Sequence, residues 1–228
     1  MKRYFVGITG ASGQIYAAAL IRALVRAGSS VDVSVTDAGC KVLRHELGVE
    51  AGAHGELLAK NLSAWLGAEI AEHVRAFDSR AVEAPPSSGT SLTGGVILCP
   101  CSMGTLARVS VGFSSNLVER AADVALKEGR PLLLVPREAP LSQIHLENLL
   151  RMARLGAVIL PASPGFYHGP KTIDDLVAHV VGKVLDRLGL ANHVGARWTG
   201  LAPAADDPGT GAPAPADPLP DTPPSARR

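Results

Sequence analysis

Short apolar runs alternate along the chain with longer segments in which apolar residues recur at helical spacing. The runs predict buried β-strands, and the segments between them predict helices that often end at a glycine. The expected strands are residues 4–8, 31–35, 95–98, 131–135 and 158–160, and the expected helices are residues 15–27, 38–47, 57–66, 117–128, 141–155 and 173–188. This alternation predicts an α/β protein with a parallel sheet covered on both faces.

Three stretches depart from this alternation. We expect loops over residues 84–95 (APPSSGTSLTGG), which are rich in turn-forming residues, and over residues 99–115 (CPCSMGTLARVSVGFSS). Beyond about Leu201 the chain consists mainly of Pro, Ala, Asp, Gly and Thr, and it lacks the apolar side chains that offset the entropy of ordering. The sequence therefore predicts one globular domain, residues 1–200, and a disordered tail, residues 201–228.

The composition narrows the possible partners and the location. The chain has 228 residues, 46% of them apolar, and its formal net charge of +1 leaves no excess of Lys and Arg for nucleic acid or an anionic membrane. The three cysteines are too few for a secreted disulfide framework, and no apolar run is long enough to span a membrane. We expect a cytoplasmic protein with no nucleic-acid or membrane partner.

Polar and glycine-rich residues follow the expected strands. GASG follows the first strand, Thr36 and Asp37 follow the second, and CPCSMGT, PRE and PASPGFYHGP follow the other three. The carboxyl ends of parallel strands meet at one edge of a sheet, where helix N-termini present N–H groups to anions. The sequence therefore predicts one ligand site at this edge.

The GASG turn is compatible with two interpretations. Gly10 and Gly13 let the backbone approach a ligand, and the Ser12 hydroxyl can donate to a phosphate. Simple capping of the next helix by Ser12 explains the same residues at least as well. The turn has neither the GxGxxG pattern of dinucleotide sites nor the GK[ST] of nucleoside-triphosphate loops. A mononucleotide or a ligand of similar size is therefore expected.

The loop after the third strand offers small donors and two thiols. Cys99 and Cys101 match no usual zinc spacing, so we expect no metal site. Ser102, Gly104 and Thr105 are suited to open a helix toward an anion or the edge of a heterocycle, and helix capping is the alternative.

The last two strand ends carry the residues best suited to chemistry. Arg137 follows a buried strand directly and can hold a phosphate, and Glu138 beside it can move a proton. Tyr167 and His168 lie in a loop from which they can reach a ligand. His145 lies within a helix and is expected to be structural.

Four motifs together resemble one family. MKRYFVGITGASGQIY, CPCSMGTLARV, NLVERAADVALKEGRPLLLVPREAPLSQIHLENL and GAVILPASPGFYHGPKTIDDLV closely resemble the flavin prenyltransferases of the UbiX type over residues 1–199. The resemblance implies a flavodoxin-like (Rossmann-type) three-layer sandwich with a mostly parallel sheet. It implies transfer of the dimethylallyl group of dimethylallyl monophosphate to N5 and C6 of reduced FMN. The prenylated FMN would then pass to a UbiD-type decarboxylase.

The resemblance also implies roles for individual residues. Catalytic roles fall to Ser12, Glu46, Lys127 and Glu138. Flavin contacts fall to Gly10, Ala11, Ser12, Thr36, Ser102, Met103, Gly104, Thr105 and Arg137, and the prenyl-phosphate pocket comprises Lys127, Arg137, Glu138, Tyr167 and Lys183. Lys183 replaces the arginine of some relatives, which keeps the positive charge without the bidentate fork. Relatives form homo-oligomers, typically dodecamers, with sites shared between subunits, and we expect the same here.

The implied chemistry fits the residue types. Cations and hydroxyl donors would meet the charge that develops on the leaving phosphate, and they would replace the magnesium of diphosphate prenyltransferases. The sequence contains no DDxxD motif, which fits a reaction without a metal. Two alternatives stay open. One is a flavin-dependent cysteine decarboxylase of the phosphopantothenoylcysteine type, for which His45 is the nearest candidate histidine. The other is a non-catalytic flavin-binding subunit of a decarboxylase.

Overall fold

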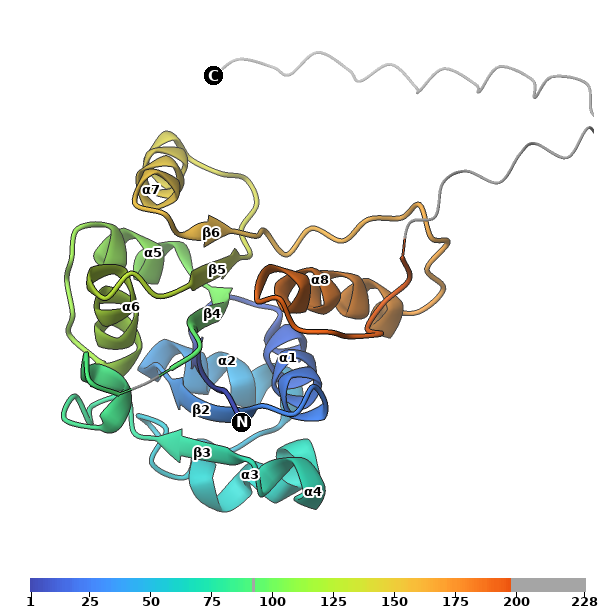
Figure 1. Ribbon diagram of the computed structural model, residues 1–228, viewed down its shortest axis with the longest axis horizontal. Coiled ribbons are helices and arrows are strands. Elements are labelled where there is room, and N and C mark those ends of the chain that lie inside the picture. Colours follow the sequence, from blue (N-terminus) through green and yellow to red (C-terminus); the bar gives the residue numbers. More distant parts are fainter. Residues whose placement is uncertain (92, 198–228) are drawn as a thin grey trace, which may run out of the picture. The chain divides into compact units, whose positions relative to one another are not determined.

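A six-stranded, all-parallel sheet organises the protein. The computed structural model describes residues 1–91 and 93–197, and Met1–Arg197 form one compact unit. The strands are β1 (Arg3–Ile8), β2 (Ser30–Val35), β3 (Val74–Phe77), β4 (Val96–Cys101), β5 (Leu132–Pro136) and β6 (Val158–Ile159). Their spatial order is β3-β2-β1-β4-β5-β6, as Figure 1 shows. The expected parallel sheet is confirmed, whereas the predicted tail, residues 201–228, lies outside the described residues.

Helices cover both faces of the sheet. They are α1 (Gln14–Arg26), α2 (Asp37–Leu47), α3 (Leu58–Leu66), α4 (Ala68–Ala71), α5 (Met103–Ser110), α6 (Leu117–Lys127), α7 (Gln143–Arg154) and α8 (Ile173–Arg187). α1, α3 and α8 contribute to one hydrophobic core, and α5, α6 and α7 to the other (Figure 1). Side chains of β1 alternate between these cores, with Val6 in the first and Phe5 in the second. The three-layer prediction is therefore confirmed. No helix among the described residues is both long and apolar enough to cross a bilayer.

Gly7 lets α6 pack closely against the sheet. A Cβ atom on Gly7 would lie 2.6 Å from Cγ1 of Val118 and 2.7 Å from Cδ2 of Leu98, which is shorter than packed carbon atoms allow. Asn116 caps the N-terminus of α6. The close packing at Gly7 therefore fixes where this helix begins relative to the ends of β1 and β4.

Two parts of the fold differ from the sequence prediction. The expected loop over residues 99–115 is wrong, because Cys99 to Cys101 complete β4 and the next residues form α5. Met103, Leu106 and Val109 form the buried face of α5, but glycine and serine residues in the segment obscured this helical spacing. The prediction also lacks α4 and β3. β3 has only four residues and pairs with β2 alone, at the edge of the sheet.

A buried carboxylate ties three strands together. The Asp32 side chain of β2 is 5% exposed and accepts a hydrogen bond of 2.8 Å from Nη1 of Arg3 on β1. It also accepts bonds of 2.8 and 2.9 Å from Nε and Nη2 of Arg75 on β3. Since β3 has few residues of its own, this bidentate pair contributes to holding it in the sheet.

We expect Asp32→Asn to lower the free energy of unfolding by ~1–2 kcal/mol, because both guanidinium groups lose the charge of a buried carboxylate, although the two arginine side chains are themselves partly exposed. Urea denaturation would measure the change. Asp186→Asn is the matched control, since Asp186 also accepts two bonds from one arginine, Arg197, but at an exposed position. It should cost less than ~1 kcal/mol. Equal losses for the two variants would contradict the role given to Asp32.

Candidate active site

A polar pocket opens at the carboxyl edge of the sheet, between the ends of β1, β2 and β4. Its volume is about 490 Å³, within the usual range for small-molecule sites. The lining residues are Gly10, Thr36, Asp37, Ala38, Ser79, Arg80, Ser102, Gly104, Thr105, Arg108, Ser115 and Asn116. The direction of winding reverses between β1 and β4, which is where doubly wound sheets bind ligands.

Three helices begin at this pocket. Thr36 caps α2, Ser102 caps α5 and Asn116 caps α6, each through a side-chain oxygen that accepts a bond from a backbone N–H. Their N-termini therefore direct partial positive charge at the pocket. Together with the hydroxyls of Ser102 and Thr105, this donor set fits a phosphorylated, hydroxyl-rich ligand such as a flavin mononucleotide. The alternative interpretation of Ser102, as a helix cap, is confirmed, and its role as a donor to a ligand stays a prediction.

Two buried polar residues, absent from the sequence prediction, hold the GASG turn. The Thr9 hydroxyl donates to the carbonyl of Pro100 (2.8 Å) and accepts from the backbone N–H of Ser102 (2.7 Å), which links the ends of β1 and β4. The Gln14 amide donates to the carbonyls of Thr9 (3.0 Å) and Ala11 (2.8 Å). The turn therefore has a defined shape without help from a ligand.

Glu46 of α2 occupies the N-terminus of α1. Its carboxylate accepts bonds from the backbone N–H groups of Gly13 (3.0 Å) and Gln14 (2.8 Å). Gly13 is the N-cap residue, with φ of 101°, and no side chain caps the helix from that position. The capping interpretation of Ser12 is therefore wrong, because a carboxylate from a different helix satisfies these N–H groups.

Ser12, Glu46 and Arg137 form a corner beside the pocket. Nε of Arg137 donates to the backbone carbonyl of Ser12 (3.1 Å). Burial opposes ionisation of Glu46, but hydrogen bonds from the Ser12 hydroxyl and the two backbone N–H groups, with the charge of Arg137, outweigh it and lower the pKa of Glu46. Glu46 is therefore an ionised carboxylate at neutral pH. The Gly10 to Gly13 turn joins this corner to the pocket.

The lowered pKa of Glu46 makes part of the stability pH-dependent. We expect wild type to exceed Glu46→Gln by ~1 kcal/mol in unfolding free energy at neutral pH, because the variant loses a charged helix cap. The folded pKa lies below the ordinary value, so the difference should persist down to the ordinary pKa near 4.5 and disappear as the pH falls through the folded pKa. Denaturation at stepped pH values would measure it. Glu69→Gln, which removes an exposed carboxylate of α4, is the control, and a pH-independent difference would contradict the assignment.

Most of the expected flavin contacts lie at the pocket or its turn. Gly10, Thr36, Ser102, Gly104 and Thr105 line the pocket. Ala11 belongs to the adjoining turn, and its carbonyl is bonded to Gln14. Met103 differs, because its side chain is buried in the hydrophobic core, so only its backbone is available to a ligand.

Lys127 lies at the other edge of the sheet. α6 runs from the pocket, at Asn116, to the amino edge, where Nζ of Lys127 lies 3.2 Å from Oε1 of Glu128. A Cβ atom on Gly89, in the segment leading to β4, would lie 3.3 Å from the same Nζ. Within one chain, Lys127 therefore does not reach the corner formed by Ser12, Glu46 and Arg137.

Tyr167 and Lys183 are associated with α8. The Tyr167 hydroxyl lies 3.1 Å from Nε2 of His179, and the rings of His168 and His179 are stacked with centroids 5.4 Å apart. Lys183 is exposed on the same helix. Glu138 is exposed after β5, and its Oε1 accepts a bond of 3.1 Å from the N–H of Ala139. His145 is structural, as predicted, because its Nδ1 accepts from the N–H of Ser142 in a capping box.

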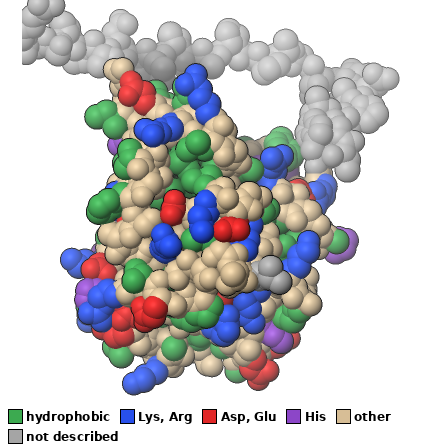
Figure 2. Space-filling view, turned by 60° about the vertical axis from the view of Figure 1, so that its left-hand side comes forward, with side chains coloured by type: hydrophobic (Ala, Val, Ile, Leu, Met, Phe, Trp, Pro, Cys, Tyr) green, Lys and Arg blue, Asp and Glu red, His purple; other side chains and the backbone are tan. Residues whose placement is uncertain are grey.

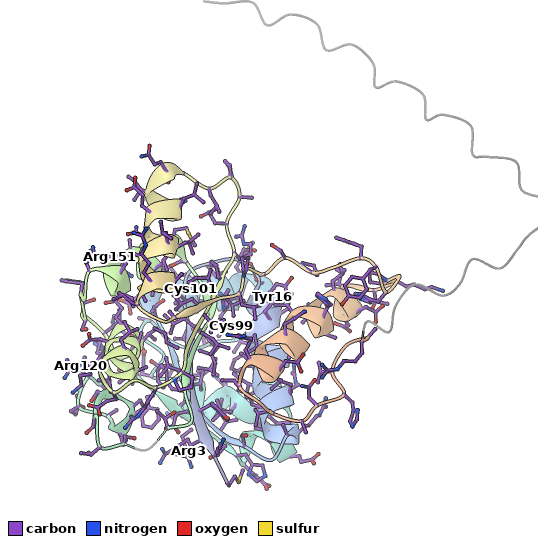
Figure 3. All side chains as sticks on the ribbon, turned by 45° about the horizontal axis from the view of Figure 1, so that its top comes forward. Arg3, Tyr16, Cys99, Cys101, Arg120 and Arg151 are labelled. Atoms are coloured by element: carbon purple, nitrogen blue, oxygen red, sulfur yellow. The ribbon has the colours of Figure 1, made fainter. Side chains whose placement is uncertain are left out.

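The three cysteines do not line the pocket. All three thiols are free and buried, and Figure 3 shows Cys99 and Cys101 in the interior of the fold. Burial raises the pKa of Cys101 to about 12 and that of Cys99 further. Among residues 1–91 and 93–197, no group of three or more His, Cys, Asp or Glu side chains is placed to hold a metal ion.

Comparison with known proteins gives one consistent result. A family model described as Flavoprotein matches residues 1–185. The flavin prenyltransferase UbiX of Pseudomonas aeruginosa is 46% identical over 197 residues, which cover 86% of this chain and 94% of that protein. AnUbiX (PadA1), solved in complex with FMN and dimethylallyl pyrophosphate, has a TM-score of 0.77 at 36% identity, over 88% of this chain and 99% of that one. A dodecameric FMN-dependent UbiX-like decarboxylase from Escherichia coli O157:H7 has a TM-score of 0.76 at 39% identity, over 87% and 100%.

Proposed function

The chain belongs to the Flavoprotein family, among the flavin prenyltransferases of the UbiX type, and we propose that it joins the dimethylallyl group of dimethylallyl monophosphate to N5 and C6 of reduced FMN. The observation that carries this proposal is the corner of Ser12, Glu46 and Arg137 beside a pocket suited to a phosphorylated ligand. A nucleotide in the pocket and an allylic phosphate at the corner would be neighbours across a single turn.

The pocket supplies the binding of FMN. The residues that hold it are Gly10, Thr36, Ser102 and Thr105, with Ala11 and Ser12 of the turn and the backbone of Met103 and Gly104. When bound in its reduced form, FMN supplies N5 and C6 as the atoms that accept the prenyl group. The fixed turn holds the two reactants in one orientation, which favours reaction by proximity.

Arg137 acts on the leaving phosphate. Its Nε donates to the carbonyl of Ser12, which fixes the guanidinium at the turn and leaves Nη1 and Nη2 as donors for a ligand. The guanidinium stabilises the negative charge as the bond to the phosphate breaks, and no metal ion is needed for that step. Tyr167, Lys183 and Lys127 add donors and positive charge, and Lys127 does so from a neighbouring subunit.

The two carboxylates of the site, Glu46 and Glu138, have different roles. Glu46 is ionised and accepts a hydrogen bond from the Ser12 hydroxyl, which fixes the direction of that hydroxyl and leaves its oxygen lone pairs available to a donor on the ligand. Glu138 accepts the proton released on ring closure at Oε2, because its Oε1 is already bonded to Ala139. The two carboxylates therefore have different tasks, one fixed within the turn and one open to the ligand.

The surface of α7 supports an oligomer. Met152 is the fully buried residue of this amphipathic helix. In contrast, the Ile144 side chain is 67% exposed, and Leu146, Leu150 and Leu155, the residue that ends the helix, are each about half exposed. Figure 2, which brings this side forward, shows hydrophobic side chains at the surface among charged ones. An apolar helix face of this kind is stabilised by contact with another subunit. The chain therefore forms a homo-oligomer, a dodecamer like the Escherichia coli neighbour.

The product is a cofactor for another enzyme. Prenylated FMN leaves this protein for a UbiD-type decarboxylase, and both proteins work in the cytoplasm. The balanced charge of the chain, +1 overall, fits partners other than nucleic acids or membranes.

Mass spectrometry of the flavin tests the proposal. The full-length protein is mixed with FMN, reduced without oxygen and given dimethylallyl monophosphate. The expected result is a flavin that gains one five-carbon unit while inorganic phosphate is released. Unchanged FMN that nevertheless binds tightly would overturn the proposal in favour of a non-catalytic flavin-binding subunit. Carbon dioxide release from a cysteine-terminated peptide would instead favour the cysteine decarboxylase.

A further inference from the structure

We propose that Arg108 recognises the phosphate of the flavin nucleotide in the pocket, and that the buried carboxylate of Glu119 positions Arg108 for this task. This inference rests on the proposed function for the identity of the ligand. The resemblance to known families assigns no role to either residue, and the sequence prediction placed Arg108 in a loop.

Arg108 lies on α5 and lines the pocket. Nε of its guanidinium is bonded to Oε1 of Glu119, and Nη2 donates to the hydroxyl of Thr105 (3.3 Å). Nη1 lies over Gly104, where an added Cβ atom would be 3.5 Å away. A guanidinium has five N–H donors in a fixed fork, so these two contacts set its plane and leave Nη1 for a ligand.

The Glu119 carboxylate holds Arg108 in a fixed position. The carboxylate is completely buried, and besides Arg108 it accepts bonds from the N–H (2.9 Å) and the hydroxyl (2.7 Å) of Ser115. Ser115 itself lines the pocket, next to Asn116, the cap of α6. A buried carboxylate is tolerated only when its lone pairs are satisfied, and here they are satisfied by groups that shape the pocket wall.

The other charged groups of the pocket are less suited to this role. Arg80 uses Nε and Nη2 for both oxygens of Asp78, and 63% of its side chain is exposed. Asp37 carries negative charge, with Oδ1 2.7 Å from Nδ1 of His54 and 3.4 Å from the Ser79 hydroxyl. Arg108 instead lies on α5, whose first turn offers N–H groups to an anion. A phosphate there gains a planar donor and a helix N-terminus together.

Paired binding measurements with FMN and riboflavin test the inference, because the two ligands differ only in the phosphate. Arg108→Gln keeps a donor for Glu119 but removes the charge and the fork. We expect it to weaken FMN binding by about 10- to 100-fold and to leave riboflavin nearly unchanged. Flavin fluorescence quenching gives both dissociation constants without any turnover. Arg26→Ala, at the far end of α1, is the control for a lost positive charge.

Two further variants separate recognition from structural support. Glu119→Gln should lower the preference for FMN over riboflavin by about 3- to 10-fold, whereas a purely structural role would weaken both flavins equally. Arg108→Gln combined with Glu119→Gln avoids a stranded buried charge, and it should show the same loss of preference if the single variant does not fold. Equal effects on the two flavins, or no effect on either, would overturn the inference. Wild-type protein that binds neither flavin would instead overturn the proposed function.

Discussion

Arg137→Ala should reduce prenyl transfer by about two to three orders of magnitude, because no other guanidinium of this chain's described residues is fixed at the Ser12 corner. In the proposed mechanism, the guanidinium is the preorganised charge that stabilises the departing phosphate. Single-turnover formation of prenylated flavin, followed by mass spectrometry, measures the effect directly. FMN binding should change less than transfer, since Arg137 is not among the residues that line the pocket, although the resemblance also makes it a flavin contact.

The Arg137→Lys variant separates the contribution of the positive charge at residue 137 from that of the planar guanidinium. Lysine keeps the charge but cannot bond the carbonyl of Ser12 and present two further donors in one plane. We expect it to recover part of the rate, and to remain about tenfold below wild type. An alanine variant with near-normal transfer would show that the phosphate is held elsewhere, and would remove Arg137 from the proposed mechanism.

Two inactive variants are expected to restore each other. Lys127 lies at the amino edge of the sheet and Arg137 at the carboxyl edge, so one chain cannot bring both to a single phosphate. If a neighbouring subunit supplies Lys127, an oligomer assembled from equal amounts of Lys127→Ala and Arg137→Ala chains contains some sites with both native residues. Random mixing predicts recovery of about a quarter of wild-type transfer from two preparations that are each nearly inactive.

The matched control uses two residues of the same corner. Mixing Arg137→Ala with Glu46→Ala should restore nothing, because each site then takes both residues from one chain. Co-expression with two different tags and purification through both would establish that the oligomers are mixed. Mixed oligomers of the first pair that stay inactive would contradict a shared site, and Lys127 would then lose its role in transfer.

The strand-to-helix alternation made the fold accessible from sequence, because buried parallel strands appear as apolar runs such as residues 31–35 and 131–135. β3 and α5 do not appear as clear apolar patterns in the sequence. β3 has half-buried positions and few residues, so its pattern is weak, and α5 is hidden by Gly104 and Ser110 although its apolar spacing is helical. Local composition favours turns in such cases, and tertiary packing decides the structure.

The site was partly predictable for a similar reason. Gly10, Thr36 and Ser102 follow strands in the chain, and topology alone places them at one edge. Glu46 lies 32 residues from Gln14, and nothing in local sequence indicates that its carboxylate caps α1. The pairing of Arg108 with Glu119 is similarly invisible, because each residue alone resembles a surface charge on a helix. Contacts between side chains of different helices and strands depend on how these elements pack, and the hydrophobic periodicity of the sequence does not reveal that packing.

The bonds of Thr9, Gln14 and Glu46 to the GASG turn have a consequence for the thermodynamics of binding. A turn that is already held by these bonds has less conformational entropy left to lose when a ligand arrives. Association should therefore be governed by diffusion and by removal of water from the pocket, with little contribution from loop ordering. Each new contact to this turn then adds to the affinity without an extra entropy cost for ordering the turn itself.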